Sequence, residues 1–262
     1  MSESPVLVER RGRVLVITFN RPEARNAIDL ECARRVGQAL DEADKDPEIR
    51  AVVVTGAGVK AFCAGADLKA VARGENSLPE EHQEWGFAGY VTHHISKPTI
   101  AAVNGFALGG GMEIALASDL VVAAETAQFG LPEVKRGIIA AAGGAFRIAR
   151  QLPPKVAMEL LLTGDAIDSG AAHRLGLVNH VVPQGRVLGA ALELAERICA
   201  NAPLAVQASK RIARGISDGR VPSEDAFWSV NAAEIAKLRT SEDAQEGPRA
   251  FAEKRAPVWK AR

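Results

Sequence analysis

Cysteine is scarce in this sequence, and long apolar runs are absent. The three cysteines, Cys32, Cys63 and Cys199, are odd in number and widely spaced, so neither a disulfide framework nor a zinc knuckle is indicated. No stretch of about 18 consecutive apolar residues occurs, and the first residues carry no secretory h-region. We therefore expect a soluble, cytoplasmic protein with no membrane partner.

An excess of charge of either sign is also missing. Lys and Arg total 32, as do Asp and Glu, so the formal net charge is zero. A neutral chain has no overall attraction to polyanions, and nucleic acid is not an expected partner. With 262 residues, 47% of them hydrophobic, the chain can bury one good core.

Several familiar motifs of catalysis and ligand binding do not occur. There is neither a G-x-S-x-G elbow nor a P-loop, and the G-x-G-x-x-A pattern at 56–61 is not followed by an amphipathic helix. His93 and His94 lack a third ligand at suitable spacing, so we expect no metal. Cys63 has no marked histidine partner, which favours a small buried residue over a nucleophile.

The order of apolar patterns predicts an α/β fold. Between the first two strand candidates, apolar residues recur at helical spacing over residues 29–44, with the charges facing away. From residue 186 onward the pattern is helical, over 186–201, 203–216, 223–238 and 242–255. The strand candidates are the apolar runs 13–20, 51–55, 99–103, 120–124 and 177–182.

These patterns indicate an α/β core over residues 1–200 and a C-terminal helical region over residues 201–262. The least regular segment is 73–94, which contains Gly74, Pro79, Gly86 and Gly89. We interpret it as a mobile segment or broken helix near a site.

Two glycine-punctuated turns follow neighbouring strand candidates, at 61–68 and 104–113. Small residues at a strand end let backbone N–H groups approach a ligand. In the second turn the chain passes from Gly109–Gly111 into a helical run, so Gly110 is expected at a helix N-terminus, where free amides favour negative charge. Three glycines entering a helix cost about 1 kcal/mol each relative to alanine, and we expect close approach of a ligand to explain them.

Two glutamates lie near these turns. Glu113 follows Gly110 by three residues and shares its helix face, and Glu133 follows Pro132 at what looks like the opening of another helix. Either acid alone is adequately explained as a first-turn helix residue. Together beside an oxyanion site they suit the addition of water to a conjugated double bond, which needs a proton acceptor and a proton donor.

Five ordered segments resemble signatures of the crotonase, or enoyl-CoA hydratase/isomerase, family. The resemblance runs from about residue 6 to the C-terminus, and five segments in order are far more specific than one. The segments are 20–27 (NRPEARNA), 62–68 (FCAGADL), 101–113 (AAVNGFALGGGME), 129–133 (FGLPE) and 251–255 (FAEKR).

The resemblance implies a spiral of ββα units and a homotrimer, or a dimer of trimers, built on the C-terminal helices. It implies that Ala64 and Gly110 donate N–H groups to the thioester oxygen of an acyl-CoA substrate, that Glu113 activates water and that Glu133 exchanges the α-carbon proton. It implies no cofactor, because CoA is part of the substrate. The implied substrate- and CoA-binding residues, the last two reaching a neighbouring subunit's CoA, are Arg25, Ala27, Ala66, Asp67, Leu68, Gly109, Phe251 and Lys254.

Hydration of a 2-enoyl-CoA is the preferred activity, because family members with other activities commonly lack one of the two acids. The alternatives are a crotonase-type isomerase and a non-catalytic CoA- or RNA-binding relative. Segments 86–89 and 242–260 look closest to carnitinyl-CoA dehydratases, whose substrate carries a quaternary ammonium.

Trp85, Phe87 and Tyr90 could offer cation–π faces to such a group. We favour the plainer interpretation that these rings line an ordinary acyl site or pack their segment. Residues 140–144 (AAAGG) depart from the Pro-Gly-x-Gly-Gly common in the family and leave the acyl chain length open.

Overall fold

Two β-sheets form the body of the protein. The computed structural model describes residues 4–67, 70 and 79–262. The larger sheet is parallel except for its first strand, and the smaller is parallel except for its last. In spatial order the larger sheet contains β1 (Val6–Arg11), β2 (Val14–Phe19), β3 (Ala51–Gly56), β5 (Thr99–Val103), β7 (Leu120–Ala124) and β10 (His180–Val182), and the smaller contains β4 (Ala61–Cys63), β6 (Phe106–Leu108), β8 (Gln128–Gly130) and β9 (Ala166–Asp168).

From β3 to β8, consecutive strands alternate between the two sheets. β3, β5 and β7 lie side by side in the larger sheet, and each is followed by a short strand, β4, β6 or β8, that joins the smaller sheet. Each turn of chain therefore adds one strand to each layer and then advances, which is the expected spiral of ββα units. Strands β2, β3, β5 and β7 match the predicted runs closely, and β10 occupies the end of the run 177–182. Strand β1 and the three-residue strands of the smaller sheet were not predicted.

Helices cover the sheets. Asp29, the first residue of the predicted run 29–44, is the N-cap of α1 and accepts a hydrogen bond from the Cys32 N–H. The α-helices are α1 (Leu30–Lys45), α3 (Gly110–Ala117), α4 (Gly144–Gln151), α5 (Pro154–Thr163), α6 (Ser169–Arg174), α7 (Val187–Cys199), α8 (Pro203–Arg214), α9 (Asp225–Leu238) and α10 (Glu242–Ala252). The 3-10 helices are η1 (Pro22–Ala24), η2 (Glu80–Trp85), η3 (Phe87–Gly89), η4 (Pro132–Arg136), η5 (Gln184–Arg186) and η6 (Pro222–Glu224).

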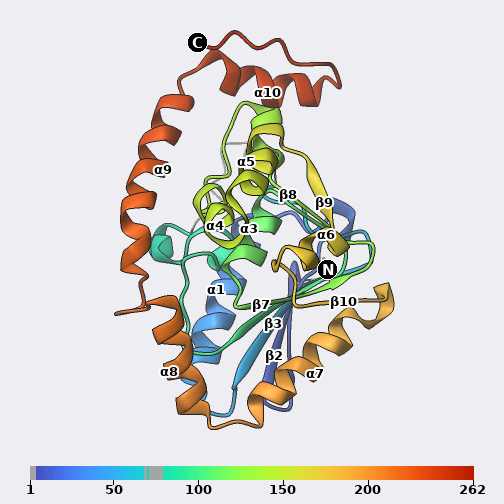
Figure 1. Ribbon diagram of the computed structural model, residues 1–262, viewed down its shortest axis with the longest axis vertical. Coiled ribbons are helices and arrows are strands. Elements are labelled where there is room, and N and C mark those ends of the chain that lie inside the picture. Colours follow the sequence, from blue (N-terminus) through green and yellow to red (C-terminus); the bar gives the residue numbers. More distant parts are fainter. Residues whose placement is uncertain (1–3, 68–69, 71–78) are drawn as a thin grey trace.

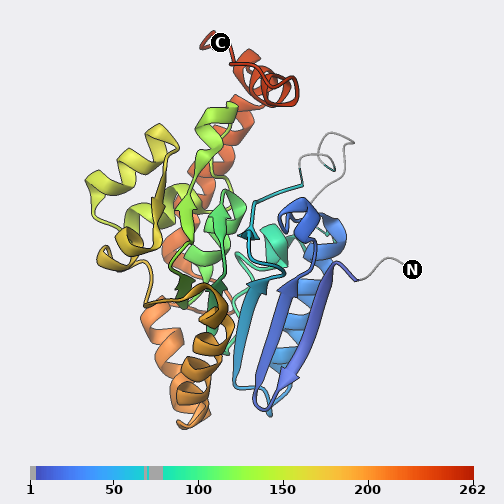
Figure 2. The same cartoon turned by 90° about the vertical axis from the view of Figure 1, so that its right-hand side faces the viewer.

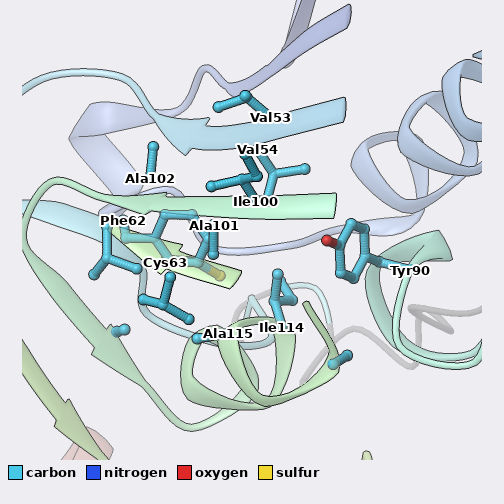
Figure 3. Close-up of a cluster of buried hydrophobic side chains, with 14 of the residues drawn as sticks. Val53, Val54, Phe62, Cys63, Tyr90, Ile100, Ala101, Ala102, Ile114 and Ala115 are labelled. Atoms are coloured by element: carbon cyan, nitrogen blue, oxygen red, sulfur yellow. The ribbon is translucent and has the colours of Figure 1, made fainter. Parts of the chain in front are cut away.

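The main core lies between the sheets and α3. Residues of β3 and β5, among them Val54 and Ile100, face Phe62, Ile114 and Tyr90 across this layer (Figure 3). Every residue of α3 is buried, so this helix is enclosed on all sides. Burial of such large side chains stabilises the fold by roughly 1.5–3 kcal/mol each.

The C-terminal helices leave this body. Figure 1 shows α9 running along the outside of the molecule from α8 to α10, and Figure 2 shows α10 and the last residues projecting beyond the sheets. The predicted helices at 203–216, 223–238 and 242–255 are confirmed with ends shifted by a few residues. In the part of the chain that the structure describes, no helix is long and apolar enough to span a membrane.

Candidate active site

The first turn of α3 supplies free main-chain amides. Gly109 precedes the helix with φ +56° and ψ −126°, a conformation open to glycine and strained for other residues. Gly110 then begins the helix, so its N–H has no partner within the helix. An N–H at this position also lies at the positive end of the helix dipole, as the sequence predicted.

The glycines at this turn serve the packing of the chain itself. A Cβ on Gly111 would stand 2.0 Å from the carbonyl oxygen of Cys63, and a Cβ on Gly110 would stand 2.3 Å from Cε1 of Phe87. The expectation that ligand approach explains these glycines is therefore corrected: α3 must come this close to the end of β4. The close contact also brings Gly65 beside the Gly110 amide, because a Cβ on Gly65 would stand 3.1 Å from the Gly110 nitrogen.

The amide of Ala64 is already engaged. Its N–H donates to the carbonyl of Arg25 at 3.1 Å, in the crossing of segments 25–28 and 64–67. An N–H bonded to a carbonyl is not available to a thioester oxygen. The prediction that Ala64 supplies an oxyanion donor is therefore wrong.

The amide of Ala66 is placed differently. Ala66 forms a parallel bridge with Ile28 in which the Ile28 N–H donates to Gly65 O and the Asp67 N–H donates to Ile28 O. A residue framed in this way turns its own N–H to the opposite side of the ladder. Among the residues that the structure describes, none accepts a hydrogen bond from the Ala66 N–H. The sequence interpretation gave Ala66 to the CoA arm and missed this free amide.

Glu113 is a buried acid on α3. Its side chain is 4% exposed, and its Oε1 accepts a hydrogen bond from the Gly144 N–H at 2.9 Å. Burial raises the pKa of Glu113 to about 8, the nearby Glu133 adds to the rise, and main-chain hydrogen bonding from Gly144 and Ala142 opposes it. The Gly143-Gly144 pair at the start of α4 could have indicated in the sequence that an amide is offered to a side chain here.

Glu133 lies in η4, where Pro132 occupies the first position. The helix expected to open at Pro132 is a short 3-10 helix. A Cβ on Gly109 would stand 3.1 Å from Oε1 of Glu133, so this acid borders the turn that precedes α3. Burial raises the pKa of Glu133 to about 7. Its buried Oε2 has no hydrogen-bond partner within the described chain.

The two glutamates therefore share one site. Each has a raised pKa, and the charge of Glu133 raises the pKa of Glu113, which requires that the carboxyls lie near each other. Two interacting acids with values near 7 and 8 hold about one proton between them at neutral pH. One can then donate while the other accepts.

The C-terminal helix α10 packs on the segment that carries Glu133. A Cβ on Gly247 of α10 would stand 1.9 Å from Arg136 O, and one on Gly137 would stand 2.2 Å from Asp243 O. The Phe251 ring lies 4.3 Å from the Arg136 guanidinium carbon and is half exposed. Lys254 follows α10 and is exposed. Contact of Phe251 and Lys254 with the CoA of a neighbouring subunit stays a prediction.

The predicted CoA-arm residues gather around one crossing of chain. Arg25 is exposed and Ala27 is buried, and the carboxylate of Asp67 accepts a hydrogen bond from Arg21 at 2.7 Å. This ion pair ties the two crossing segments together. Leu68 lies outside the described residues, and Gly109 lies beside Glu133 and not in this group. CoA binding by these residues stays a prediction.

The three aromatic residues of segment 85–90 have separate surroundings. Trp85 stacks between His82 at 3.7 Å and His93 at 5.0 Å, while the Tyr90 hydroxyl is within hydrogen-bonding distance of Ser118, at 2.8 Å. Both rings pack their segment, in agreement with the plainer interpretation. Only Phe87 lies at the site, against Gly110.

Cys63 is fully buried at the end of β4. Burial raises the pKa of its thiol to about 12, so it remains protonated at neutral pH. This confirms the interpretation of Cys63 as a small packed residue. It contributes its carbonyl as the surface against which Gly111 packs.

Comparisons with known proteins identify the family of the whole chain. The profile of the enoyl-CoA hydratase/isomerase family matches residues 9–262. The carnitinyl-CoA dehydratase of Salmonella typhi is 45% identical over 266 residues, covering all of both chains. The solved carnitinyl-CoA hydratase of Mycobacterium avium is 63% identical with a TM-score of 0.98 over all of both chains. The enoyl-CoA hydratase of Mycobacterium tuberculosis H37Rv is 46% identical with a TM-score of 0.77, covering 99% of this chain and 100% of that one.

A family profile over nearly the whole chain, together with full-length relatives, settles the classification. The chain belongs to the enoyl-CoA hydratase/isomerase family and is a hydro-lyase of the enoyl-CoA hydratase type.

Proposed function

We propose that Glu113 and Glu133 carry out the reversible addition of water to the double bond of a 2-enoyl-CoA thioester. One observation carries this proposal: the carboxyls of buried Glu113 and half-buried Glu133, both with raised pKa values, lie together at a helix start whose first amide has no partner within the described chain. Acids and bases are most effective when their pKa lies near the working pH.

The N–H groups of Gly110 and Ala66 are the proposed donors to the thioester oxygen. Gly65 packs against Gly110. Ala66 is the next residue in the chain, so its amide lies close to this contact. Negative charge develops on the thioester oxygen when water attacks the β-carbon, and two fixed amides stabilise that charge.

Proton transfer then completes the addition. Hydration starts from the form of the pair in which the shared proton is on Glu133, although the higher pKa of Glu113 favours the form with the proton on Glu113. Glu113 accepts a proton from water as the oxygen bonds to the β-carbon, and Glu133 gives a proton to the α-carbon. Afterwards Glu113 is protonated and Glu133 is ionised. This product state is the starting state for the elimination of water, so one pair of acids serves both directions. The reaction involves no redox change.

Loss of the conjugated enoyl absorbance on mixing with crotonyl-CoA tests the proposal. We expect turnover with the intact protein and its loss in the Glu113→Gln/Glu133→Gln double variant. A panel of short, longer and crotonobetainyl thioesters extends the assay. Absence of turnover with all of them would leave a CoA-binding module as the better description.

Carnitinyl-CoA is a second candidate substrate, in the dehydration direction. The full-length likeness to proteins named carnitinyl-CoA dehydratase favours it. Trp85 and Tyr90 cannot provide the cation–π faces, because both pack away from the site. Phe87 is the remaining ring, and it is partly exposed against Gly110.

Phe87→Leu separates the two substrates. If Phe87 contacts a quaternary ammonium, the variant loses more kcat/KM with crotonobetainyl-CoA than with crotonyl-CoA, by about five-fold for a contact of about 1 kcal/mol. Equal losses would show that Phe87 acts by shape alone.

A homotrimer, or a dimer of trimers, remains the proposed assembly. Large apolar side chains on the C-terminal helices support it, because Leu204, Ile212 and Val230 are each more than 60% exposed. Light scattering on the purified protein tests this, and a monomeric mass would contradict it.

A further inference from the structure

Helix α9 touches the body through an unusual face. Its large apolar residues Phe227 and Val230 are 45% and 62% exposed, and Asn231 is the one residue of α9 that is buried. Phe227 and Trp228 both pack on the Phe146 ring of α4, so part of the contact is aromatic. The inward face of α9 also presents groups that can form specific polar contacts.

That face consists of Glu224, Trp228 and Asn231, which follow one another at i, i+4 and i+7. Nδ2 of Asn231 donates to Ala141 O at 2.8 Å. A Cβ on Gly143, whose φ is +96°, would stand 3.1 Å from the Trp228 ring. Asn231 and Trp228 therefore rest on residues 140–144, which we call the 140s loop, whereas Glu224 pairs with Arg147 of α4.

Arg147 joins this face to two further parts of the site. Its guanidinium makes a bidentate pair with Glu224, at 3.1 and 2.7 Å, and donates to Val91 O at 2.7 Å. Arg147 is 4% exposed, and a buried bidentate pair of this kind fixes both partners in orientation. Val91 in turn donates to Phe87 O, so the segment bearing Phe87 is tied to the same guanidinium.

The last residue of the 140s loop, Gly144, is hydrogen-bonded to Glu113. The Gly144 N–H donates to Oε1 of Glu113, and a Cβ on Gly144 would stand 2.8 Å from that oxygen. The orientation of the carboxylate therefore depends on the position of this loop. No contact between α9 and Glu113 itself is needed.

We propose that Glu224, Trp228 and Asn231 are positioning residues that fix the 140s loop and thereby hold the Glu113 carboxylate in its reactive orientation. The proposal rests on the proposed role of Glu113. It makes the C-terminal region part of the active-site support, through a polar helix face separate from the exposed apolar side chains.

Asn231→Ala is the decisive variant, because it removes one hydrogen bond from the loop and leaves the apolar packing of α9 unchanged. We expect kcat to fall about ten-fold with KM within about two-fold, since a misplaced catalytic group lowers turnover. Ser229→Ala is the matched control, because that exposed hydroxyl bonds only Asp225 O of its own helix in the described structure. Its kcat stays at the wild-type value.

Two catalytic backgrounds show whether the effect passes through Glu113. In Glu113→Gln, adding Asn231→Ala is expected to change the residual kcat by less than about two-fold, whereas in Glu133→Gln the ten-fold loss persists. A ten-fold loss in both backgrounds would mean general loosening of the site and would overturn the proposal. An unchanged kcat in Asn231→Ala alone would overturn it as well.

A readout without turnover separates this proposal from the proposed function. The protonated carboxyl of Glu113 gives an infrared band that Glu113→Gln lacks, and its titration midpoint can be followed with pH. The ionisable groups that face Glu113 are Glu133, Arg147 and Cys63.

Weakening the Gly144 bond in Asn231→Ala raises that midpoint by about 0.5 pH unit or more, because the bond favours the ionised form. A shifted midpoint in a protein without hydratase activity would sink the function and keep the positioning role. An unshifted midpoint would sink the positioning role.

Discussion

The two sides of the site are built in opposite ways. On the amide side, the groups are main chain held by main chain, since Ala64, Ile28 and Asp67 all donate within one crossing. On the acid side, Glu113 and Glu133 are side chains withdrawn from water, and Glu133 Oε2 lacks a partner within the described residues. The amide side completes the hydrogen bonds of the fold, whereas the acid side opposes folding. Substitutions should therefore separate loss of activity from loss of stability.

Gly110→Pro should produce the largest loss on the amide side. It deletes a donor, and the added ring meets Phe87, because even a Cβ at Gly110 would stand 2.3 Å from that ring. We expect kcat to fall at least 10²–10³-fold, or about 2.7–4 kcal/mol. Steady-state kinetics checks this, with circular dichroism to show that the fold persists. Retained turnover would remove Gly110 from the mechanism.

Glu113→Gln and Glu133→Gln should each lower hydration by about 10²-fold or more, which is the usual contribution of a general acid or base. Both substitutions keep the shape of the side chain and remove its proton exchange. Single-turnover hydration of crotonyl-CoA measures the effect. An isomerase, by contrast, would tolerate one of the two changes.

Ala66→Pro and Ala64→Pro form a matched pair on the amide side. Ala66→Pro removes a free N–H, so we expect about a 10²-fold loss in kcat with little change in Tm. Ala64→Pro breaks the bond to Arg25 O and should cost about 1–3 kcal/mol of stability. Kinetics and thermal unfolding of both variants decide between them. Equal kinetic losses at unchanged Tm would restore Ala64 as a donor.

The acid side should give a bell-shaped pH profile. With pKa values of about 7 and 8, the pair carries one proton between these limits, both protons below them and none above. The kcat/KM for hydration should fall about ten-fold per pH unit outside that window. In either single glutamine variant one limb should disappear. A profile that is flat from pH 5 to 9 would contradict a shared proton.

The effect of Glu113→Gln on stability should be opposite in sign to its effect on activity, because the variant gains stability at high pH. The folded pKa of about 8 lies above the value of 4.5 for a free carboxyl, so the folded state binds the proton more tightly. The contribution of Glu113 to the free energy of unfolding is complete below about pH 4.5. It is lost as the pH rises to about 8, by at most about 1.4 kcal/mol per pH unit.

Glutamine does not ionise, so denaturant unfolding at pH 5 and pH 8 should show a relative gain for the variant only at the higher pH. A constant difference between the two proteins would mean that Glu113 ionises alike in both states.

Much of the architecture followed from local pattern. Strands β2, β3, β5 and β7 and the helices at 29–44 and beyond 186 were predicted because apolar periodicity is a property of neighbouring residues. Strand β1 was missed, because only its first residue is buried and its sequence ends in charged residues. The three-residue strands β4, β6, β8 and β9 could not be predicted, since such short runs carry no period and exist only by pairing with one another. The order of glycine and glutamate along the chain was enough to predict Glu113, Glu133 and Gly110 as partners.

The sequence by itself determined the family, the acid pair and the helix start at Gly110, because these depend on residue type and spacing. Only the tertiary structure decided that Ala64 is engaged and Ala66 free, since the partner of Ala64 is Arg25, far away in the sequence. It also decided that residues of α9 support the loop at Glu113, more than a hundred residues apart in sequence from that acid. Contacts of that range leave no periodic trace, because they depend on where whole elements pack.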